Sequence, residues 1–519
     1  MHSGLEGPPL LLINPWIEDF AAYDFFARPL GLLYLAGVLA AQGYEIHLID
    51  CLGGLRLYPT PFGTGRYPKQ TLPPPPALQG VARRYGRYGI PESAFREQLA
   101  RVPAPAAILV TSLMTYWYPG VNAAIRLARK HFPRVPVILG GIYATLCPEH
   151  ARRHSGADLV VTGPGEGAIG SILEDLLGSQ TSDSTTADSI LGRDAQATSR
   201  LPESKKPFAA PGNIPDGGTG KNSDFPRSAG ELPISAEPSQ TAAVLPSPLR
   251  GEGQGGGEKV ARCIPPLDSL PYPALHLLPQ PAFIPILTSR GCPLHCSYCA
   301  SRQLQSRYQR RQPRAVVAEL LHWQDRLGLA DVAFYDDALL VDAENHLLVI
   351  LEELAGLGRI FRFHTPNGLH ARLITPRVAR WLKRAPFATL RLGVETTALG
   401  PTRPDRKLAA GELEAALAHL KEAGFNQNQM GVYLLLGLPD QDDGELEISI
   451  RRVRELDATP ILAQYSPIPG TALWPQAVQS SRYDLEGEPL YHNNSLFPCW
   501  PEFSWPRFTH LKRMALGQS

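Results

Sequence analysis

The sequence predicts an α/β protein with an N-terminal doubly wound, Rossmann-like domain and a C-terminal partial (β/α)6 barrel. Two regions, residues 8–178 and 263–478, repeat short, continuously apolar strands that alternate with helical stretches. This pattern is typical of parallel sheets covered on both faces. Between the two regions, residues 179–262 are rich in Ser, Thr, Pro and Gly. The chain of 519 residues is also too long for one ordinary domain.

The first region contains five expected strands and three expected helices. The strands are residues 10–15, 44–51, 106–113, 136–142 and 158–163. The helices are residues 28–43, 119–132 and 166–177. An open parallel sheet binds its ligand outside the carboxyl ends of its strands, so residues 8–178 are expected to bind a nucleotide or a cofactor there.

Residues 179–262 are expected to form a disordered linker or insertion. Their only aromatic residues are Phe208 and Phe225. Such a segment has too little apolar surface to offset the entropy that it would lose on ordering. We therefore expect it to contribute nothing to a core.

The second region, residues 263–478, repeats the strand and helix pattern six times. The strands are residues 283–288, 331–335, 361–365, 389–394, 430–436 and 461–465. Thr375 before Pro376 marks the start of one helix, and Gly424 marks the end of another. Six such units predict a partial barrel of the TIM type, with its chemistry at the C-terminal ends of the strands. Residues 479–519 show no clear period and are expected to form a C-terminal cap.

The composition argues against two classes of partner. Fifty Lys and Arg against 49 Asp and Glu give a formal charge of +1, so a basic face for nucleic acid is not expected. The longest apolar stretch, residues 29–41, is shorter than the roughly 20 residues that cross a bilayer, so no membrane span is expected. The N-terminus has no export signal, and the cytoplasm is the expected location.

Three of the seven cysteines crowd into one loop directly after the first strand of the expected barrel. Cys292, Cys296 and Cys299 follow a C-x3-C-x2-C spacing. Soft thiolate ligands suit an iron–sulfur cluster or zinc. Three ligands on a four-iron cluster leave one iron open for a further ligand. The alternative is a structural zinc site with His295 or a distant cysteine as its fourth ligand.

Residues 288–299, TSRGCPLHCSYC, resemble the signature of the radical S-adenosylmethionine (SAM) superfamily, including Tyr298 before the third cysteine. The resemblance implies that Cys292, Cys296 and Cys299 hold a [4Fe–4S] cluster whose open iron chelates SAM. Electron transfer then breaks a C–S bond of SAM and yields methionine and a 5′-deoxyadenosyl radical. It also implies a reductant protein such as flavodoxin or ferredoxin.

Carboxylates follow two later barrel strands, where members of this superfamily contact SAM. Asp336 and Asp337 end the second strand, although the Gly-Gly-Glu form common there is absent. Each of these two residues could equally cap the following helix or lie at the rim. Glu395 ends the fourth strand and resembles the polar residue near the SAM ribose or methionine. Its alternative is a buried carboxylate paired with Arg391 or Arg372.

Two further segments resemble the adenine side of the SAM site. Residues 431–439 resemble the glycine motif of the fifth strand and place Gly437 there, and residues 465–471 resemble the segment after the sixth strand and place Pro467 there. Gly lets the backbone approach a ligand because it has no Cβ. His364, at the end of the third strand, is either a proton-transfer group or a structural residue.

A doubly wound domain before such a barrel resembles the cobalamin-binding radical SAM subfamily. The resemblance implies that five residues contact cobalamin: Ser112, Thr115, Gly140, Gly141 and Gly163. Ordinary turn chemistry is the alternative for each of them. The Asp-x-His-x-x-Gly motif that supplies a lower cobalt ligand is missing, because residues 50–54 read DCLGG. The identity of any lower ligand therefore stays open.

These features together predict a radical SAM enzyme with cobalamin as its second cofactor, which methylates an unactivated carbon or phosphorus centre of a small molecule. A radical cyclisation or rearrangement with accessory cobalamin is the alternative reaction. A protein that senses cobalamin or SAM is an alternative from another class, which the intact cysteine motif disfavours. Release of 5′-deoxyadenosine under strong reductant distinguishes an enzyme from a sensor.

Overall fold

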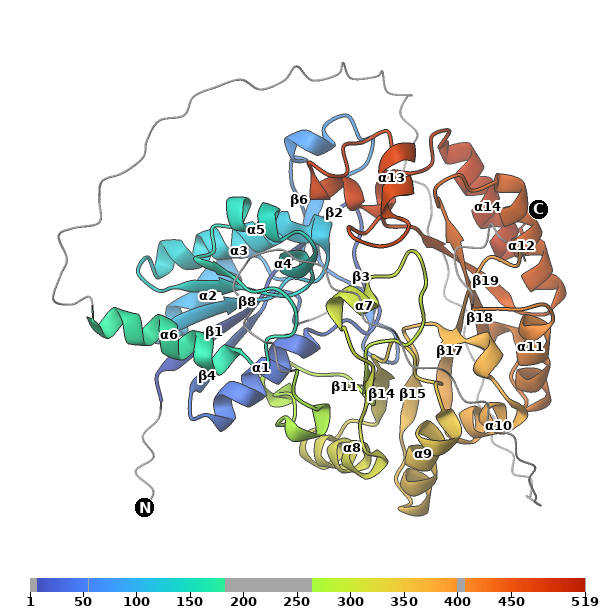
Figure 1. Ribbon diagram of the computed structural model, residues 1–519, viewed down its shortest axis with the longest axis horizontal. Coiled ribbons are helices and arrows are strands. Elements are labelled where there is room, and N and C mark those ends of the chain that lie inside the picture. The colour runs from blue at the N-terminus through green and yellow to red at the C-terminus, as the bar shows by residue number, and fades with distance from the viewer. Residues whose placement is uncertain (1–6, 55, 183–263, 399–406, 519) are drawn as a thin grey trace, which may run out of the picture. The chain divides into compact units, whose positions relative to one another are not determined.

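The computed structural model describes residues 7–54, 56–182, 264–398 and 407–518 (Figure 1). All of the predicted linker except residues 179–182 lies outside the described residues. The chain divides into a larger unit of residues 1–79, 83–195 and 263–519 and a smaller one of residues 80–82 and 196–262. All the helices and strands named below belong to the larger unit. No helix among the described residues has the length and apolar character needed to cross a membrane.

The first sheet has five parallel strands, as the sequence predicts. They are β1 (Pro9–Asn14), β4 (Glu45–Asp50), β8 (Ala107–Val110), β9 (Val137–Leu139) and β10 (Leu159–Val160). Their order in the sheet is β4-β1-β8-β9-β10, which is the doubly wound order of flavodoxin-like domains. The helices are α1 (Leu30–Ala41), α2 (Glu92–Arg101), α3 (Tyr118–His131), α4 (Ile142–Leu146), α5 (Pro148–His154) and α6 (Ile169–Ser182).

Strand β1 shows why these strands are apolar without interruption. Leu11 and Ile13 point to one face of the sheet and pack against α2 and α3, whereas Leu10 and Leu12 point to the other face and pack against α1 and α6. All four side chains are fully buried. Because both faces are covered, every position of the strand must be apolar.

Short antiparallel strands between β1 and α2 were not predicted. They are β2 (Ile17–Asp19), β3 (Tyr23–Asp24), β5 (Gly65–Arg66), β6 (Lys69–Thr71) and β7 (Gly86–Tyr88). They pair as β2-β7-β6 and β3-β5. Each has only two or three residues, too few to show an alternating pattern in the sequence.

The second sheet contains six parallel strands in sequence order. They are β11 (Ile284–Ile286), β14 (Asp331–Phe334), β15 (Arg362–His364), β17 (Phe387–Glu395), β18 (Met430–Leu436) and β19 (Thr459–Gln464). A short strand that was not predicted, β16 (Leu369–His370), pairs with β17. In the described part of the chain β11 and β19 are the two edges, so the barrel is partial.

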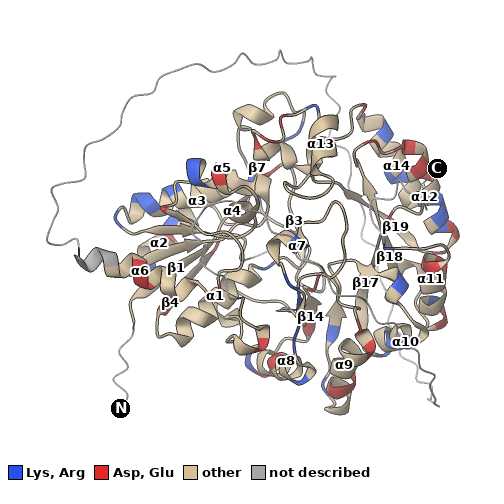
Figure 2. Ribbon diagram, viewed as in Figure 1, with Lys and Arg blue, Asp and Glu red and all other residues tan. Residues whose placement is uncertain are grey.

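Helices surround this sheet on its outer side (Figure 1). They are α8 (Pro313–Leu327), α9 (Leu347–Gly356), α10 (Pro376–Arg384), α11 (Glu412–Glu422), α12 (Asp443–Glu455) and α14 (Trp505–Leu516). Two shorter helices, α7 (Ser301–Leu304) and α13 (Trp474–Ser480), and the pair β12 (Ser289–Arg290) and β13 (Gln309–Arg310) complete the region. Acidic and basic residues intermix along the outer helices α11 and α12 (Figure 2).

The domain boundary that the sequence predicts at residue 478 does not coincide with the end of the barrel core. Helix α14 lies in the expected cap, yet Phe508, Leu511 and Ala515 are buried in the barrel core, where α14 contacts α12 and β19. The helix begins at a capping residue, because the Ser504 hydroxyl accepts a hydrogen bond from Arg507 N–H. The last helix of the barrel is therefore part of residues 479–519.

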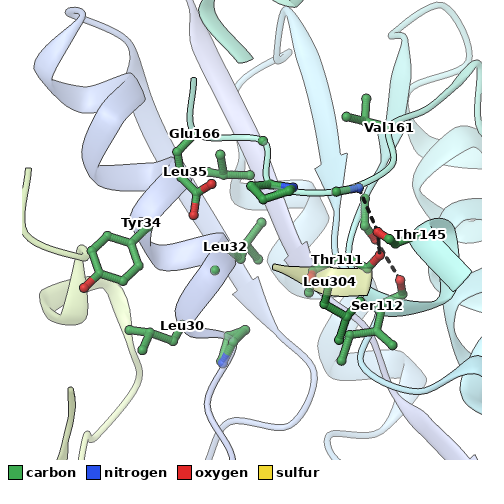
Figure 3. A pocket seen from close by; sticks show the side chains of 18 of the residues that line it. Leu30, Leu32, Tyr34, Leu35, Thr111, Ser112, Thr145, Val161, Glu166 and Leu304 are labelled. Atoms are coloured by element: carbon green, nitrogen blue, oxygen red, sulfur yellow. Dashed lines mark hydrogen bonds between the residues drawn. The ribbon is translucent and has the colours of Figure 1, made fainter. Parts of the chain in front are cut away.

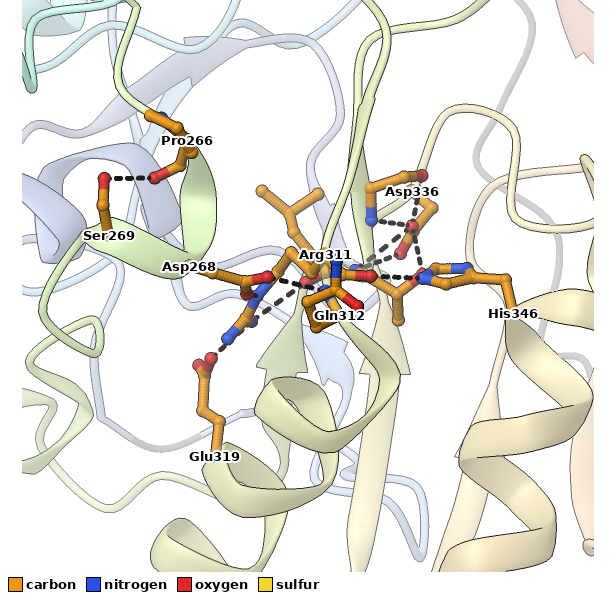
Figure 4. Close-up of polar contacts among 11 residues, drawn as sticks. Pro266, Asp268, Ser269, Arg311, Gln312, Glu319, Asp336 and His346 are labelled. Atoms are coloured by element: carbon orange, nitrogen blue, oxygen red, sulfur yellow. Dashed lines mark hydrogen bonds and ion pairs between the residues drawn. The ribbon is translucent and has the colours of Figure 1, made fainter.

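A buried polar cluster holds the segment in which the described chain resumes after residue 263. Arg311 lies between Asp268 and Glu319, with Nε 2.8 Å from Asp268 Oδ1 and Nη1 2.5 Å from Glu319 Oε2 (Figure 4). The backbone N–H of Gln312 also donates to Asp268, and the Arg311 carbonyl lies 3.0 Å from His346 Nε2. Arg311 thereby joins this segment to α8 and to the residues before α9.

We predict that Arg311→Met destabilises the protein by about 3–5 kcal/mol, because it leaves the buried Glu319 carboxylate without its cation. Urea denaturation measures the change in the free energy of unfolding. Arg359→Met is the matched control, since Arg359 pairs with Asp325 at the surface, and this change should cost at most about 1 kcal/mol. Equal losses in the two variants would contradict the prediction.

Candidate functional site

A cavity of about 470 Å³ opens at the carboxyl ends of β8, β9 and β10. Its wall is mostly apolar and includes Leu30, Leu32 and Leu35 from α1. Figure 3 shows these side chains together with Thr111, Ser112 and Val161 from the strand ends and Thr145 from α4. Residues of the second region, such as Leu287, Arg290 and Asp337, line the same cavity. One space is therefore shared by the predicted cofactor-binding sheet and the start of the cysteine loop.

Four residues predicted to contact cobalamin line this cavity: Ser112, Gly140, Gly141 and Gly163. Gly141 has φ +92°, and a Cβ there would lie 2.4 Å from the Ser112 carbonyl oxygen, so the turn after β9 requires glycine. A Cβ on Gly140 would meet nothing closer than Val161 O at 3.9 Å. Gly140 thus leaves room for a ligand, whereas Gly141 serves the backbone.

Hydroxyl groups of Ser112 and Thr145 fasten these turns. Ser112 Oγ donates to the Gly140 carbonyl at 2.7 Å and accepts from Tyr143 N–H at 3.1 Å, at the start of α4. Thr145 Oγ1 donates to Gly141 O at 2.8 Å and accepts from Gly163 N–H at 2.9 Å (Figure 3). The Ser112 hydroxyl is consequently occupied within the protein.

Thr115 does not line the cavity, which differs from its predicted contact with cobalamin. Its hydroxyl lies 3.0 Å from Nδ1 of His492, and Nε2 of that imidazole lies 2.8 Å from Leu485 O. Burial lowers the pKa of His492 to about 4. Thr115 therefore contacts the C-terminal segment.

The cysteines lie in the loop between β12 and α7. Cys292 and Cys296 are partly buried and Cys299 is exposed. Cys299 N–H donates to Cys296 O at 3.2 Å, and Ser301 N–H lies 3.5 Å from Cys299 Sγ. Within the described ranges, no three His, Cys, Asp or Glu side chains converge closely enough to hold a metal ion. Three accessible or partly buried thiols on one loop nevertheless form a donor set that fits a [4Fe–4S] cluster.

Asp336 does not present its carboxylate to the cavity. It accepts hydrogen bonds from the backbone N–H and the hydroxyl of both Thr288 and Ser289, at 2.6–3.2 Å. Its predicted contact with the SAM amino group therefore has no support in the geometry, because its oxygen atoms hold the residues just before the cysteine loop. Asp337 does line the cavity, and burial raises the pKa of its carboxyl.

Glu395 ends β17 in the left-handed region, with φ +66°. Its Oε1 accepts from Lys407 Nζ at 2.8 Å, and both side chains are largely buried. The carboxylate is therefore buried and paired, with Lys407 as a partner that the sequence did not predict. The ammonium of Lys407 also lies 5.5 Å from the ring centroid of Tyr298, so this pair reaches the cysteine loop.

The remaining predicted residues lie away from the cavity. Gly437 follows β18 with φ +85°, and its N–H donates to Gln441 Oε1 at 2.7 Å. Pro467 is buried after β19. His364 is buried with Nε2 2.8 Å from Asp331 Oδ1, which supports its structural alternative.

Comparison with protein families matches two domains. The model of the radical SAM superfamily matches residues 286–453, and that of the B12 binding domain matches residues 88–173. The chain combines a B12-binding domain with a radical SAM domain. The radical SAM domain implies SAM and a [4Fe–4S] cluster, and the B12-binding domain implies cobalamin. The cysteine loop and the four cavity residues of the first sheet lie inside the matched ranges.

Two curated relatives are methyltransferases by name. One is the uncharacterized methyltransferase PH0819 of Pyrococcus horikoshii, 25% identical over 254 residues that cover 46% of this chain and 53% of the relative. The other is cytidylyl-2-hydroxyethylphosphonate methyltransferase of Streptomyces wedmorensis, 24% identical over 359 residues that cover 65% and 56%. The chain thus spans little more than half the length of these relatives.

The fold is similar to that of a solved radical SAM methyltransferase, TsrM from Kitasatospora setae. One TsrM structure aligns with a TM-score of 0.56 and 14% identity and covers 94% of this chain and 83% of TsrM. A second, with cobalamin and a [4Fe–4S] cluster bound, gives 0.55 and 16% and covers 92% and 76%. The two-domain α/β architecture predicted from the sequence is confirmed.

The sequence did not reveal one charged pair of the cavity wall. Arg290 and Glu166 are 124 residues apart, and Arg290 Nη2 lies 2.6 Å from Glu166 Oε1. Each residue belongs to a run that resembles the family, TSRGC or TGPGE, but neither run indicates the other as its partner. Only the fold brings them together.

We predict that the protein loses stability as the pH falls from about 6.5 to about 4, in part through His492. The pKa of His492 is lower in the folded protein than in the unfolded chain, so the unfolded chain binds more protons in this window. The full shift corresponds to a loss of about 3 kcal/mol in the free energy of unfolding. His492→Asn should reduce this loss. Urea denaturation at several pH values measures it, and an unchanged pH dependence would refute the assignment.

Proposed function

We propose that this protein is a cobalamin-dependent radical SAM methyltransferase acting on an unactivated carbon or phosphorus centre of a small molecule. The main support is the shared cavity. It is lined by the strand ends of the B12-binding domain and by residues beside the cysteine loop. The names of the curated relatives favour methyl transfer over cyclisation or rearrangement.

Different residues of this chain have different roles at the site. Cys292, Cys296 and Cys299 would hold the cluster, and the room beside Gly140 would admit part of the cobalamin. When bound, the cluster with SAM supplies a 5′-deoxyadenosyl radical and cobalamin supplies the methyl group. Asp336 fixes the start of the cysteine loop, and most of the cavity wall is apolar.

The proposed enzyme needs an electron donor, and we assign this role to a small reductant protein such as flavodoxin or ferredoxin. The exposed Cys299 supports a reducing compartment, for which the cytoplasm is the expected one. The buried Cys499, with its thiol 3.7 Å from Ala477 O, takes no part in the cluster.

We predict that replacing Cys292, Cys296 and Cys299 together by Ala abolishes iron binding and SAM cleavage. Native protein reconstituted under anaerobic conditions should bind roughly four irons per chain and show an absorption band at about 400 nm. It should also release 5′-deoxyadenosine under strong reductant. Cys499→Ala is the control and should keep the iron. Tightly bound zinc without iron uptake would overturn the radical mechanism, and iron without 5′-deoxyadenosine would favour the sensor.

We predict that Gly140→Val weakens the binding of hydroxocobalamin at least tenfold, because it adds bulk to the wall of the cavity at a position where a Cβ meets no protein atom closer than 3.9 Å. Absorbance titration of the full chain measures the affinity. Gly356→Val is the matched control, since a Cβ on Gly356, at the end of α9, meets no atom within 4 Å and lies away from the cavity. Equal affinity of the native protein and both variants for hydroxocobalamin would show that cobalamin does not bind in this cavity.

A further inference from the structure

The ion pair of Arg290 and Glu166 forms part of the cavity wall. Each side chain is only 6% exposed. The pair is held by one hydrogen bond, from Arg290 Nη2 to Glu166 Oε1. Glu166 comes from the loop between β10 and α6, whereas Arg290 lies two residues before Cys292. The pair therefore joins the two domains at the wall of the cavity.

One donor and one acceptor of this pair are left over. Arg290 Nη1 and Glu166 Oε2 are both buried and have no hydrogen-bond partner among the described residues. A buried polar atom without a partner costs free energy, so these two atoms call for a ligand. The Tyr34 ring lies 6.0 Å from the guanidinium carbon and closes the pair on one side.

The chemistry of the two atoms selects the ligand. An anion such as a phosphate or a carboxylate would meet the negative charge of Glu166, and a cation would meet that of Arg290. A neutral group with an acceptor and a donor side by side satisfies both atoms without adding charge. A primary carboxamide has this arrangement, because its oxygen accepts from Nη1 and its NH2 donates to Oε2.

We propose that Glu166 and Arg290 form a binding subsite for a primary carboxamide. The inference rests on the proposed function, since the corrin ring of cobalamin carries several such side arms, and Glu166 lies within the matched B12-binding range. A substrate carboxamide is the other source of the same group. In either case the subsite ties a bound molecule to the chain segment that leads into the cysteine loop.

The first experiment titrates the full chain with hydroxocobalamin and with its monocarboxylic derivatives, in each of which one corrin carboxamide is hydrolysed to a carboxylate. One derivative should bind the native chain at least tenfold more weakly than hydroxocobalamin, because its carboxylate faces Glu166. Glu166→Gln should bind that derivative more tightly than the native chain does. This pattern assigns the carboxamide to cobalamin.

The second experiment adds propionamide or propionate to the cobalamin-loaded chain and follows thermal unfolding. Stabilisation by propionamide alone, absent in Glu166→Gln, assigns the subsite to a substrate carboxamide. Glu18→Gln is the matched control for both experiments, because it breaks a comparable buried pair with Arg87, at 2.7 Å and 9% exposure, that does not line the cavity. Its ligand preferences should equal those of the native chain.

The outcomes separate the two proposals. If hydroxocobalamin binds but neither experiment shows a preference that depends on Glu166, the carboxamide subsite is overturned and the cofactor assignment stands. If Glu18→Gln changes the preferences as Glu166→Gln does, the effect is general loss of stability and the subsite is again overturned. If the native chain takes up no hydroxocobalamin, the proposed function and the inference that rests on it both fail.

Discussion

The geometry of the site depends on the buried carboxylate of Asp336. Four donors from Thr288 and Ser289 converge on it, so the chain that leaves β11 is held at the end of β14. Burial raises the pKa of this carboxyl, and the hydrogen bonds oppose that rise by stabilising the charged form. The adjacent backbone N–H of Arg311 donates to Thr288 O, which extends the same restraint to the polar cluster around Asp268. The cysteine loop thus starts from a fixed base.

The same fixed base explains how two domains come to share one cavity. Arg290 follows directly after Ser289 and reaches Glu166 of the first domain across the wall. The turns on the opposite side are equally constrained, since Gly141 has no space for a Cβ and Thr145 binds both Gly141 and Gly163. Cofactors bound from either side would therefore meet preformed surfaces.

The sequence predicts best those features that neighbouring residues encode together. Strand β18 has the predicted bounds because its apolar run is continuous, and the cysteine loop and Gly140 follow from local motifs. Helix α2 was not predicted because it buries only Phe95 and Leu99 among charged residues. Helix α14 was also not predicted, although Ser504 caps its start. The pairs of Glu166 with Arg290 and of Glu395 with Lys407 arise from the fold, and a pattern in the sequence does not record them.

The C-terminal segment has a consequence for how the protein is made. His492 meets Thr115, and Asn493 Nδ2 donates to Asp19 Oδ1 across 474 residues of sequence, while α14 fills the last side of the barrel. These contacts cannot form until residues 492–516 have left the ribosome. Long loops must also close before such contacts stabilise the protein, which slows folding. Both domains thus reach their final form only after residues 492–516 have been made, and loading with cofactors must follow that step.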